Sequence, residues 1–148
     1  MQSSEWAKIY PTAESSLTVP ASLEHLALLR SWVRVVAARD VTSVDLLHDL
    51  LLAVDEAATT LMAHAVASTD LFCTVDTAPA DQFRAILAAV TSTPIDGSAA
   101  SFGWFVMQTL AHHVVLDQRY DCVSDLWTVS ITLSTARRAS SSKMNDCT

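Results

Sequence analysis

The sequence predicts an α/β (α+β) fold, a two-layer sandwich in which a mostly antiparallel, mixed sheet carries helices on one face. Three observations support this prediction. An uninterrupted stretch with helical periodicity covers residues 44–66, and segments with strand-like alternation lie on both sides of it. The predicted order is strand, helix, helix, strand, strand, helix, strand. Short loops between neighbouring strands favour antiparallel pairing.

The composition indicates one domain and limits the kinds of partner. The chain has 148 residues, 51% hydrophobic and 17% charged, with a formal net charge of −7. No apolar run reaches the ~18 residues of a membrane-spanning helix, so the apolar excess belongs to a core or a protein interface. The acidity argues against direct nucleic-acid binding and suits a basic protein partner. Because the N-terminus lacks an apolar signal segment, we expect a cytoplasmic protein.

The domain organisation follows from where core-forming residues begin and end. We expect a flexible leader over residues 1–15, a folded domain over 16–136 and a disordered tail over 137–148. The three cysteines are widely spaced and form no CxxC or metal-ligand pattern, so we interpret them as reduced thiols. They are Cys73, Cys122 and Cys147.

The first predicted elements are a short strand and a helix. Residues 16–20 alternate and end at Pro20, as edge strands often do. A helix is expected from Ser22, its N-cap, with Glu24 in the first turn, where the helix dipole favours an acid. Its apolar stripe is Leu23, Leu26, Leu29, Val33, Val36 and Ala37. Three arginines lie off this stripe and are expected to be solvated: Arg30, Arg34 and Arg39.

The long helix over residues 44–66 combines a buried face with an unusual polar edge. Ala and Leu dominate it, and its apolar face is Leu47, Leu50, Leu51, Val54, Ala58, Leu61 and Ala65. Glu56, Thr60 and His64 follow one another at a spacing of four, which advances only about 40° per step and forms one ledge. A carboxylate, a hydroxyl and an imidazole on one ledge are compatible with a ligand-facing edge. A solvated helix face is the alternative.

The second half of the chain is predicted to add three strands and one helix. Residues 71–77 and 83–91 are expected to form a hairpin, and 126–134 a half-buried strand. The remaining segments are a loop over 92–100, a helix from an N-cap at Ser101 to 116, and a polar turn over 117–125. We expect Trp104 and Phe105 in the core. The pair His112 and His113 is expected to end the helix, and it offers too few ligands for a metal site.

Three stretches, in this order, resemble motifs of the GHKL-type ATPase fold and, within it, the RsbW-type anti-sigma factors and serine-protein kinases. LLLAVDEAATTLMAHAV is similar to the N-box helix, in which an apolar run precedes SEA-x-TN and a later His. SFGWFVMQTLAHHV resembles the second Gly-rich box with its following helix, and WTVSITLSTARR the closing strand. The likeness covers about residues 17–138 and is closest to actinobacterial anti-sigma factors directed at a SigF of stress response or development.

The resemblance implies a nucleotide site that departs from the family pattern. Glu56 holds the position of the general base, whereas Thr60 replaces the Asn that helps to hold Mg²⁺, and a hydroxyl is a weaker ligand. His64 and Gly103 match the rest of this site. The first Gly box is replaced by TSTPIDGSAA, and the chain has only two glycines where a phosphate loop needs several. We therefore expect weakened binding of ATP and Mg²⁺ and lean against an active enzyme.

Three functions remain open from the sequence. The first is an anti-sigma factor that sequesters an alternative, SigF-like sigma factor and is released by an anti-anti-sigma protein. The resemblance maps its partner-binding face onto Leu28 and Arg30 and implies a homodimer; plain helix packing and a solvated charge are the alternatives for these residues. The second is an ATP-dependent serine/threonine kinase that phosphorylates its anti-anti-sigma antagonist, with Glu56 as base. In that case the alternative for Asp55 and Glu56 is that both are ordinary surface acids. The third is a scaffold or small-ligand sensor.

Overall fold

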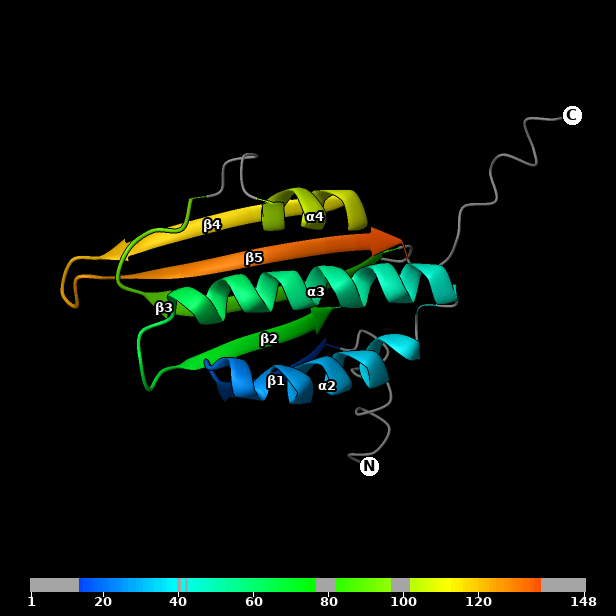
Figure 1. The fold of residues 1–148 in the computed structure, drawn as a ribbon, viewed down its shortest axis with the longest axis horizontal. Coiled ribbons are helices and arrows are strands. Elements are labelled where there is room, and N and C mark those ends of the chain that lie inside the picture. Colours follow the sequence, from blue (N-terminus) through cyan, green and yellow to red (C-terminus); the bar gives the residue numbers. More distant parts are fainter. Residues whose placement is uncertain (1–13, 40, 42, 77–81, 97–101, 137–148) are drawn as a thin grey trace, which may run out of the picture.

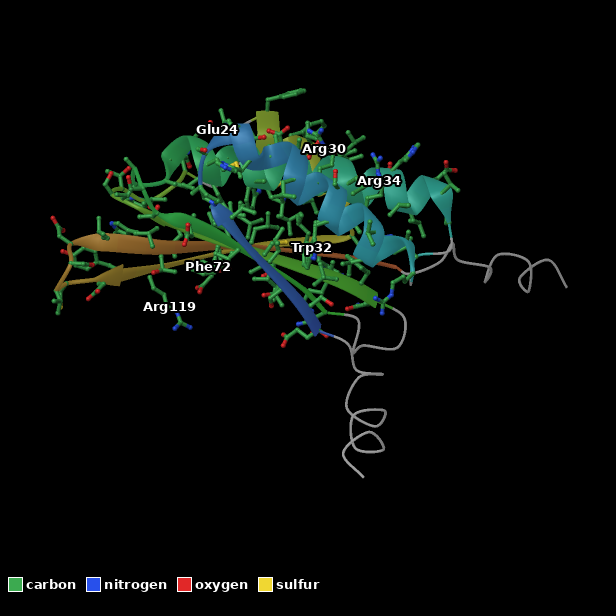
Figure 2. The ribbon with its side chains drawn as sticks, turned by 90° about the horizontal axis from the view of Figure 1, so that it is seen from below. Glu24, Arg30, Trp32, Arg34, Phe72 and Arg119 are labelled. Atoms are coloured by element: carbon green, nitrogen blue, oxygen red, sulfur yellow. The ribbon has the colours of Figure 1, made fainter. Side chains whose placement is uncertain are left out.

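The computed structural model describes residues 14–39, 41, 43–76, 82–96 and 102–136, and these form one sheet covered by helices on one face (Figure 1). The helical elements are a short 3-10 turn η2 (Leu23–His25), α2 (Leu26–Ala38), α3 (Val44–His64) and α4 (Phe102–Leu110). The strands are β1 (Glu14–Pro20), β2 (Asp70–Asp76), β3 (Gln82–Thr91), β4 (His113–Asp121) and β5 (Leu126–Ala136). Figure 2 shows the helices on one side of the sheet, while Phe72 and Arg119 project from the other. The predicted two-layer sandwich is confirmed.

The sheet has the order β1-β2-β3-β5-β4, and all four pairings between its described strands are antiparallel. The predicted antiparallel character is therefore confirmed, while the parallel component that a mixed sheet would need does not occur among these strands. β3 lies at the centre, paired with β2 on one side and β5 on the other. Along β3 every second side chain points to the helices and is buried, which explains why an Ala-rich segment forms a strand here.

The principal correction is a fifth strand, β4, which the sequence prediction assigned partly to a helix and partly to a turn. The helix ends at Leu110, and the Ala111 N–H makes one further helical hydrogen bond to the Met107 carbonyl (2.9 Å). The β-branched pair Val114 and Val115 then begins a strand that pairs with β5 from His113↔Ser134 to Asp121↔Leu126. Tertiary pairing with β5 thus overrides the helical spacing of the apolar residues.

The buried face of α4 also differs from the predicted one. Trp104 is buried, as expected, and Met107 lies beside it in the core. Phe105, which we expected in the core, is 59% exposed. The two histidines do not cap the helix: His112 Nδ1 is hydrogen-bonded with Thr135 Oγ1 (3.2 Å), and His113 is the first residue of β4.

Two helix starts illustrate how local chemistry sets the boundaries. Ser22 makes no side-chain cap; its hydroxyl is instead hydrogen-bonded with His25 Nδ1 (3.0 Å), and the chain enters α2 through a 3-10 turn. Ser43 caps α3, because its Oγ accepts a hydrogen bond from the Leu46 N–H (3.3 Å). The predicted Ser22 cap is therefore wrong in its side-chain contact, whereas the predicted long helix is confirmed.

The core lies between the sheet and α3, the helix that packs against both α2 and α4. The predicted apolar face of α3 is confirmed at its centre, where Leu50, Val54 and Leu61 are fully buried. Its ends, Leu47 and Ala65, are only half-buried. The largest fully buried side chains are Phe83, Leu29, Leu50, Leu61, Leu71, Leu87, Met107, Ile131 and Leu133. Among the described residues no helix has the length and apolar character to cross a membrane.

Cys73 is part of this core, and its burial predicts a stability that depends on alkaline pH. Burial raises the pKa of the Cys73 thiol from 9.0 to about 12. Above pH 9 the unfolded chain loses this proton while the folded chain keeps it, so stability falls as pH rises from 9 towards 12, by about 1.4 kcal/mol per pH unit. Urea unfolding at pH 8 and pH 10 measures this effect. The free energy of unfolding should fall more between these pH values in the wild type than in Cys73→Ala. Equal pH slopes in the two proteins would contradict the buried thiol.

Of the other two cysteines, Cys122 lies among the described residues and outside the core. Cys122 is exposed in the turn between β4 and β5, and both it and Cys73 are free thiols, as predicted. Cys147 lies outside the described residues, as do most of the predicted leader and all of the predicted tail.

Candidate functional site

The ledge of Glu56, Thr60 and His64 lies along one side of α3, and the side chains of Thr60 and His64 are hydrogen-bonded to the helix backbone. The Thr60 hydroxyl donates a hydrogen bond to the Glu56 carbonyl (2.8 Å), and the His64 ring, through Nδ1, donates to the Thr60 carbonyl (2.8 Å). Such bonds four residues back along a helix use the side chain's donor locally. The structure therefore brings the three predicted residues together on one edge, but the hydroxyl proton and the Nδ1 proton are already used.

Glu56 and Gly103 are the two predicted site residues that come into close contact. A Cβ atom at position 103 would lie 2.6 Å from Glu56 Oε2, so the carboxylate occupies the space that a larger residue would fill. Gly103 is in the first turn of α4, where free N–H groups and the helix dipole favour a negative charge. The acid expected to act as a base is thus packed against the helix that follows the second Gly-rich box.

The segment after β3 is held by a residue that the sequence analysis did not single out. Gln118 on β4 forms two hydrogen bonds with Ile95: its Oε1 accepts from the Ile95 N–H (2.7 Å) and its Nε2 donates to the Ile95 carbonyl (3.0 Å). Nothing in the sequence indicated this role, because residue 118 was placed in the predicted turn and not on a strand. Gly97, in the segment that replaces the first Gly box, and the predicted N-cap Ser101 lie outside the described residues.

The outer surface of α2 exposes apolar side chains. Leu28 is 55% exposed and Val35 66% exposed, and their spacing of seven places them on one stripe of the helix. An exposed apolar stripe on an otherwise amphipathic helix is a feature that a protein partner can cover. The structure thus leaves Leu28 available for contact.

Arg30, the second predicted partner-binding residue, is not simply solvated. Its Nε donates to both carboxylate oxygens of Asp55 on α3, at 3.0 Å (Oδ1) and 2.9 Å (Oδ2). The expectation of a solvated arginine was wrong because α2 and α3 pack side by side and bring the two residues together. Asp55 is held by the same ion pair, and its side chain is 26% exposed.

A groove lies beside this ion pair, between α2 and α3. It has a volume of about 340 Å³, and its lining residues are Arg30, Arg34, His48, Leu51, Leu52 and Asp55. Those from α3 are spaced by three and four, so they form the stripe of α3 that faces α2. The structure therefore presents two surfaces for function: the α3–α4 ledge and the α2–α3 groove with the exposed stripe of α2.

Comparison with known proteins assigns the family. Two Mycobacterium tuberculosis proteins, each named anti-sigma-F factor RsbW, one from strain CDC 1551 / Oshkosh and one from strain ATCC 25618 / H37Rv, are 33% identical to this chain over 130 residues. The match covers 86% of this chain and 75% of each relative. The chain belongs to the RsbW family of anti-sigma factors. The resemblance drawn from the three motifs is thereby confirmed, although no family model matches the chain.

The fold of this RsbW family member agrees with a solved structure. A crystal structure of the RsbU and RsbW domains of a Mycobacterium tuberculosis protein superposes with a TM-score of 0.57 at 13% identity. The superposition covers 84% of this chain and 32% of that longer chain. At this identity the likeness shows the shared fold, and the roles of Glu56, Thr60, His64, Gly103, Leu28 and Arg30 remain predictions.

Proposed function

We propose that this chain is an anti-sigma factor that holds an alternative, SigF-like sigma factor away from RNA polymerase, and that an anti-anti-sigma protein releases it. The observation that carries the proposal is the 33% identity to two anti-sigma-F factors along 86% of the chain. The net charge of −7 supports it, since a sigma factor binds DNA and carries basic surface. The protein then works by binding in the cytoplasm, without direct contact to nucleic acid or membrane.

The partner-binding surface in this proposal combines the exposed side of α2 with its edge towards α3. Leu28 supplies an exposed apolar contact, and Arg30, fixed by Asp55, supplies a positioned guanidinium. We also propose a homodimer. The face of the sheet opposite the helices supports it, because Phe72 is 50% and Val115 56% exposed there, and Phe72 points away from the helices in Figure 2.

The ledge residues fit Mg-ATP poorly, and we propose that the nucleotide site is degenerate. Thr60 offers a hydroxyl already committed to the Glu56 carbonyl, where the family uses an amide oxygen. The Glu56 carboxylate packs over Gly103, where a Cβ atom would lie 2.6 Å from its Oε2. Two glycines in the whole chain give little backbone for a phosphate loop. The kinase alternative, with Glu56 as base and an anti-anti-sigma substrate, is therefore the less favoured function.

Affinity capture tests this proposal directly. The tagged protein is used as bait in lysate of its source cell, with and without Mg-ATP, and bound proteins are identified by mass spectrometry. A sigma factor in stoichiometric yield under both conditions is the expected result. An antagonist that becomes phosphorylated only with Mg-ATP would establish the kinase instead. The absence of both partners would overturn both functions and leave a scaffold.

If binding does not depend on the ledge, Glu56→Gln should leave sigma-factor affinity within about twofold of wild type. The substitution removes the charge of a catalytic base and keeps the shape of the side chain. Isothermal titration calorimetry with the captured sigma factor measures this, and a thermal melt verifies folding. Loss of binding in a folded Glu56→Gln variant would show that the ledge is part of the interface.

A further inference from the structure

The groove between α2 and α3 carries positive charge that the described residues leave uncompensated. Arg30 is neutralised by Asp55, with Nε 2.9 Å from Oδ2. Arg34, four residues further along α2, is exposed, and no ion pair joins it to the described part of the chain. His48 lines the groove from α3. The groove thus has a local positive charge on a chain whose net charge is −7.

The apolar part of the groove lies directly beside Arg34. Leu51 is 6% exposed and belongs to the core, so it closes the groove on the inside, while Leu52 is 54% exposed at its surface. Figure 2 places Arg30 and Arg34 on the side of α2 away from the sheet, whereas Trp32 lies towards the sheet. The groove therefore offers apolar surface together with a guanidinium directed outwards.

The size and shape of the groove suit a protein segment. About 340 Å³ is near the lower end of the range of roughly 300–1,000 Å³ for ligand pockets, enough for a few side chains. Two adjacent helices present a shallow channel into which a third helix can place its side chains, as in helix-in-groove recognition. The charge pattern selects the occupant: aliphatic side chains contact Leu51 and Leu52, and a neighbouring carboxylate pairs with Arg34.

We propose that the α2–α3 groove binds an acidic, amphipathic helix of the sigma factor, with a carboxylate of that helix on Arg34 and its aliphatic side chains on Leu51 and Leu52. The inference rests on the proposed function for the identity of the partner. It extends the contact region from Arg30, which lines the groove, to Arg34 and α3, while Leu28 lies on the other flank of α2. The Arg30–Asp55 ion pair forms one wall of the groove and holds the two helices in position.

The test compares Arg34→Gln with the matched control Arg39→Gln. Both arginines are exposed on or next to α2 and both variants lose one charge, but Arg39 does not line the groove. Affinity for the captured sigma factor is measured by calorimetry, after thermal melts have shown wild-type folding. We expect Arg34→Gln to weaken binding at least about tenfold, because the pair is desolvated in the complex. Arg39→Gln should change it less than twofold, and His48→Gln should show a smaller loss than Arg34→Gln.

Each outcome decides the proposal. A loss of affinity in Arg34→Gln but not in Arg39→Gln supports it. A double-mutant cycle with sigma-factor variants in which single Asp or Glu residues are replaced by Asn or Gln then identifies the carboxylate by its coupling to Arg34. If wild type, Arg34→Gln and His48→Gln bind the sigma factor with equal affinity, the proposal that the groove binds it is overturned, and the anti-sigma function is unaffected. Equal losses for Arg34→Gln and Arg39→Gln would indicate general electrostatics and also overturn it. If the wild type binds no sigma factor, the proposed function itself fails, and the groove proposal fails with it.

Discussion

Replacing Phe83 with alanine is expected to lower the free energy of unfolding by about 3–5 kcal/mol, the cost of removing a large aromatic side chain from a closed core. Phe83 is fully buried on β3, the central strand, beneath the helical layer. Since small domains are stable by only about 5–15 kcal/mol, this one substitution should remove a large part of the total. Urea unfolding followed by circular dichroism measures the change.

The matched control is Phe72→Ala on the neighbouring strand β2. Its ring is 50% exposed on the open face of the sheet, so truncation removes little buried surface and should cost less than about 1 kcal/mol in the monomer. A similar cost for the two substitutions would contradict the assignment of Phe83 to the inner face. A large loss at position 72 that depends on protein concentration would instead report the proposed dimer.

The second large effect is expected on binding. Leu28→Asp should reduce affinity for the sigma factor by at least about 2 kcal/mol, roughly 30-fold, because a charge would replace an apolar contact at the centre of the proposed interface. Folding should be unaffected, since Leu28 is 55% exposed and its removal opens no cavity. Calorimetry with the purified sigma factor measures the loss.

Val123→Asp is the control for this substitution. It introduces the same charge at a side chain that is 92% exposed in the turn between β4 and β5, away from α2. Its affinity should match that of the wild type. If Leu28→Asp binds the sigma factor as tightly as Val123→Asp does, the outer side of α2 is not the interface.

The elements that were predictable from the sequence are those in which one signal dominates. In α3, propensity and periodicity agree over 21 residues, so both the helix and its buried face were recoverable. In β5, Val129, Ile131 and Leu133 are buried and alternate with Ser and Thr, which is the pattern of a strand with one covered face. When one side of a helix or strand is buried, its apolar residues recur at a regular spacing that is visible in the sequence.

β4 was mispredicted, and α4 was predicted as a helix but with the wrong end and with Phe105 in the core, because their signals conflict. The apolar residues from Phe102 to Val114 fit a helical period, yet the aromatic pair Phe102 and Phe105 is exposed and Trp104 with Met107 is buried. Which face of α4 turns inwards depends on its packing against α3, a tertiary contact that no local pattern contains. Likewise, β4 is a strand because β5 is available to pair with it.

The candidate site was likewise predictable only in part from the sequence. The spacing of Glu56, Thr60 and His64 correctly placed them on one ledge, but spacing does not reveal that Thr60 and His64 bond back to the helix. The ion pair between Arg30 and Asp55 joins residues 25 apart in sequence, and the groove beside it exists only once α2 and α3 pack together. Side-chain pairings across helices depend on packing that a single sequence does not specify.

Run-off transcription with purified components tests the central claim most directly. RNA polymerase core enzyme, the captured sigma factor and its promoter are mixed with increasing amounts of this protein, with and without Mg-ATP. We expect transcription to be silenced at stoichiometric protein, and Mg-ATP to leave the titration unchanged. Undiminished transcription would contradict the anti-sigma function, and silencing that requires Mg-ATP would contradict the degenerate nucleotide site.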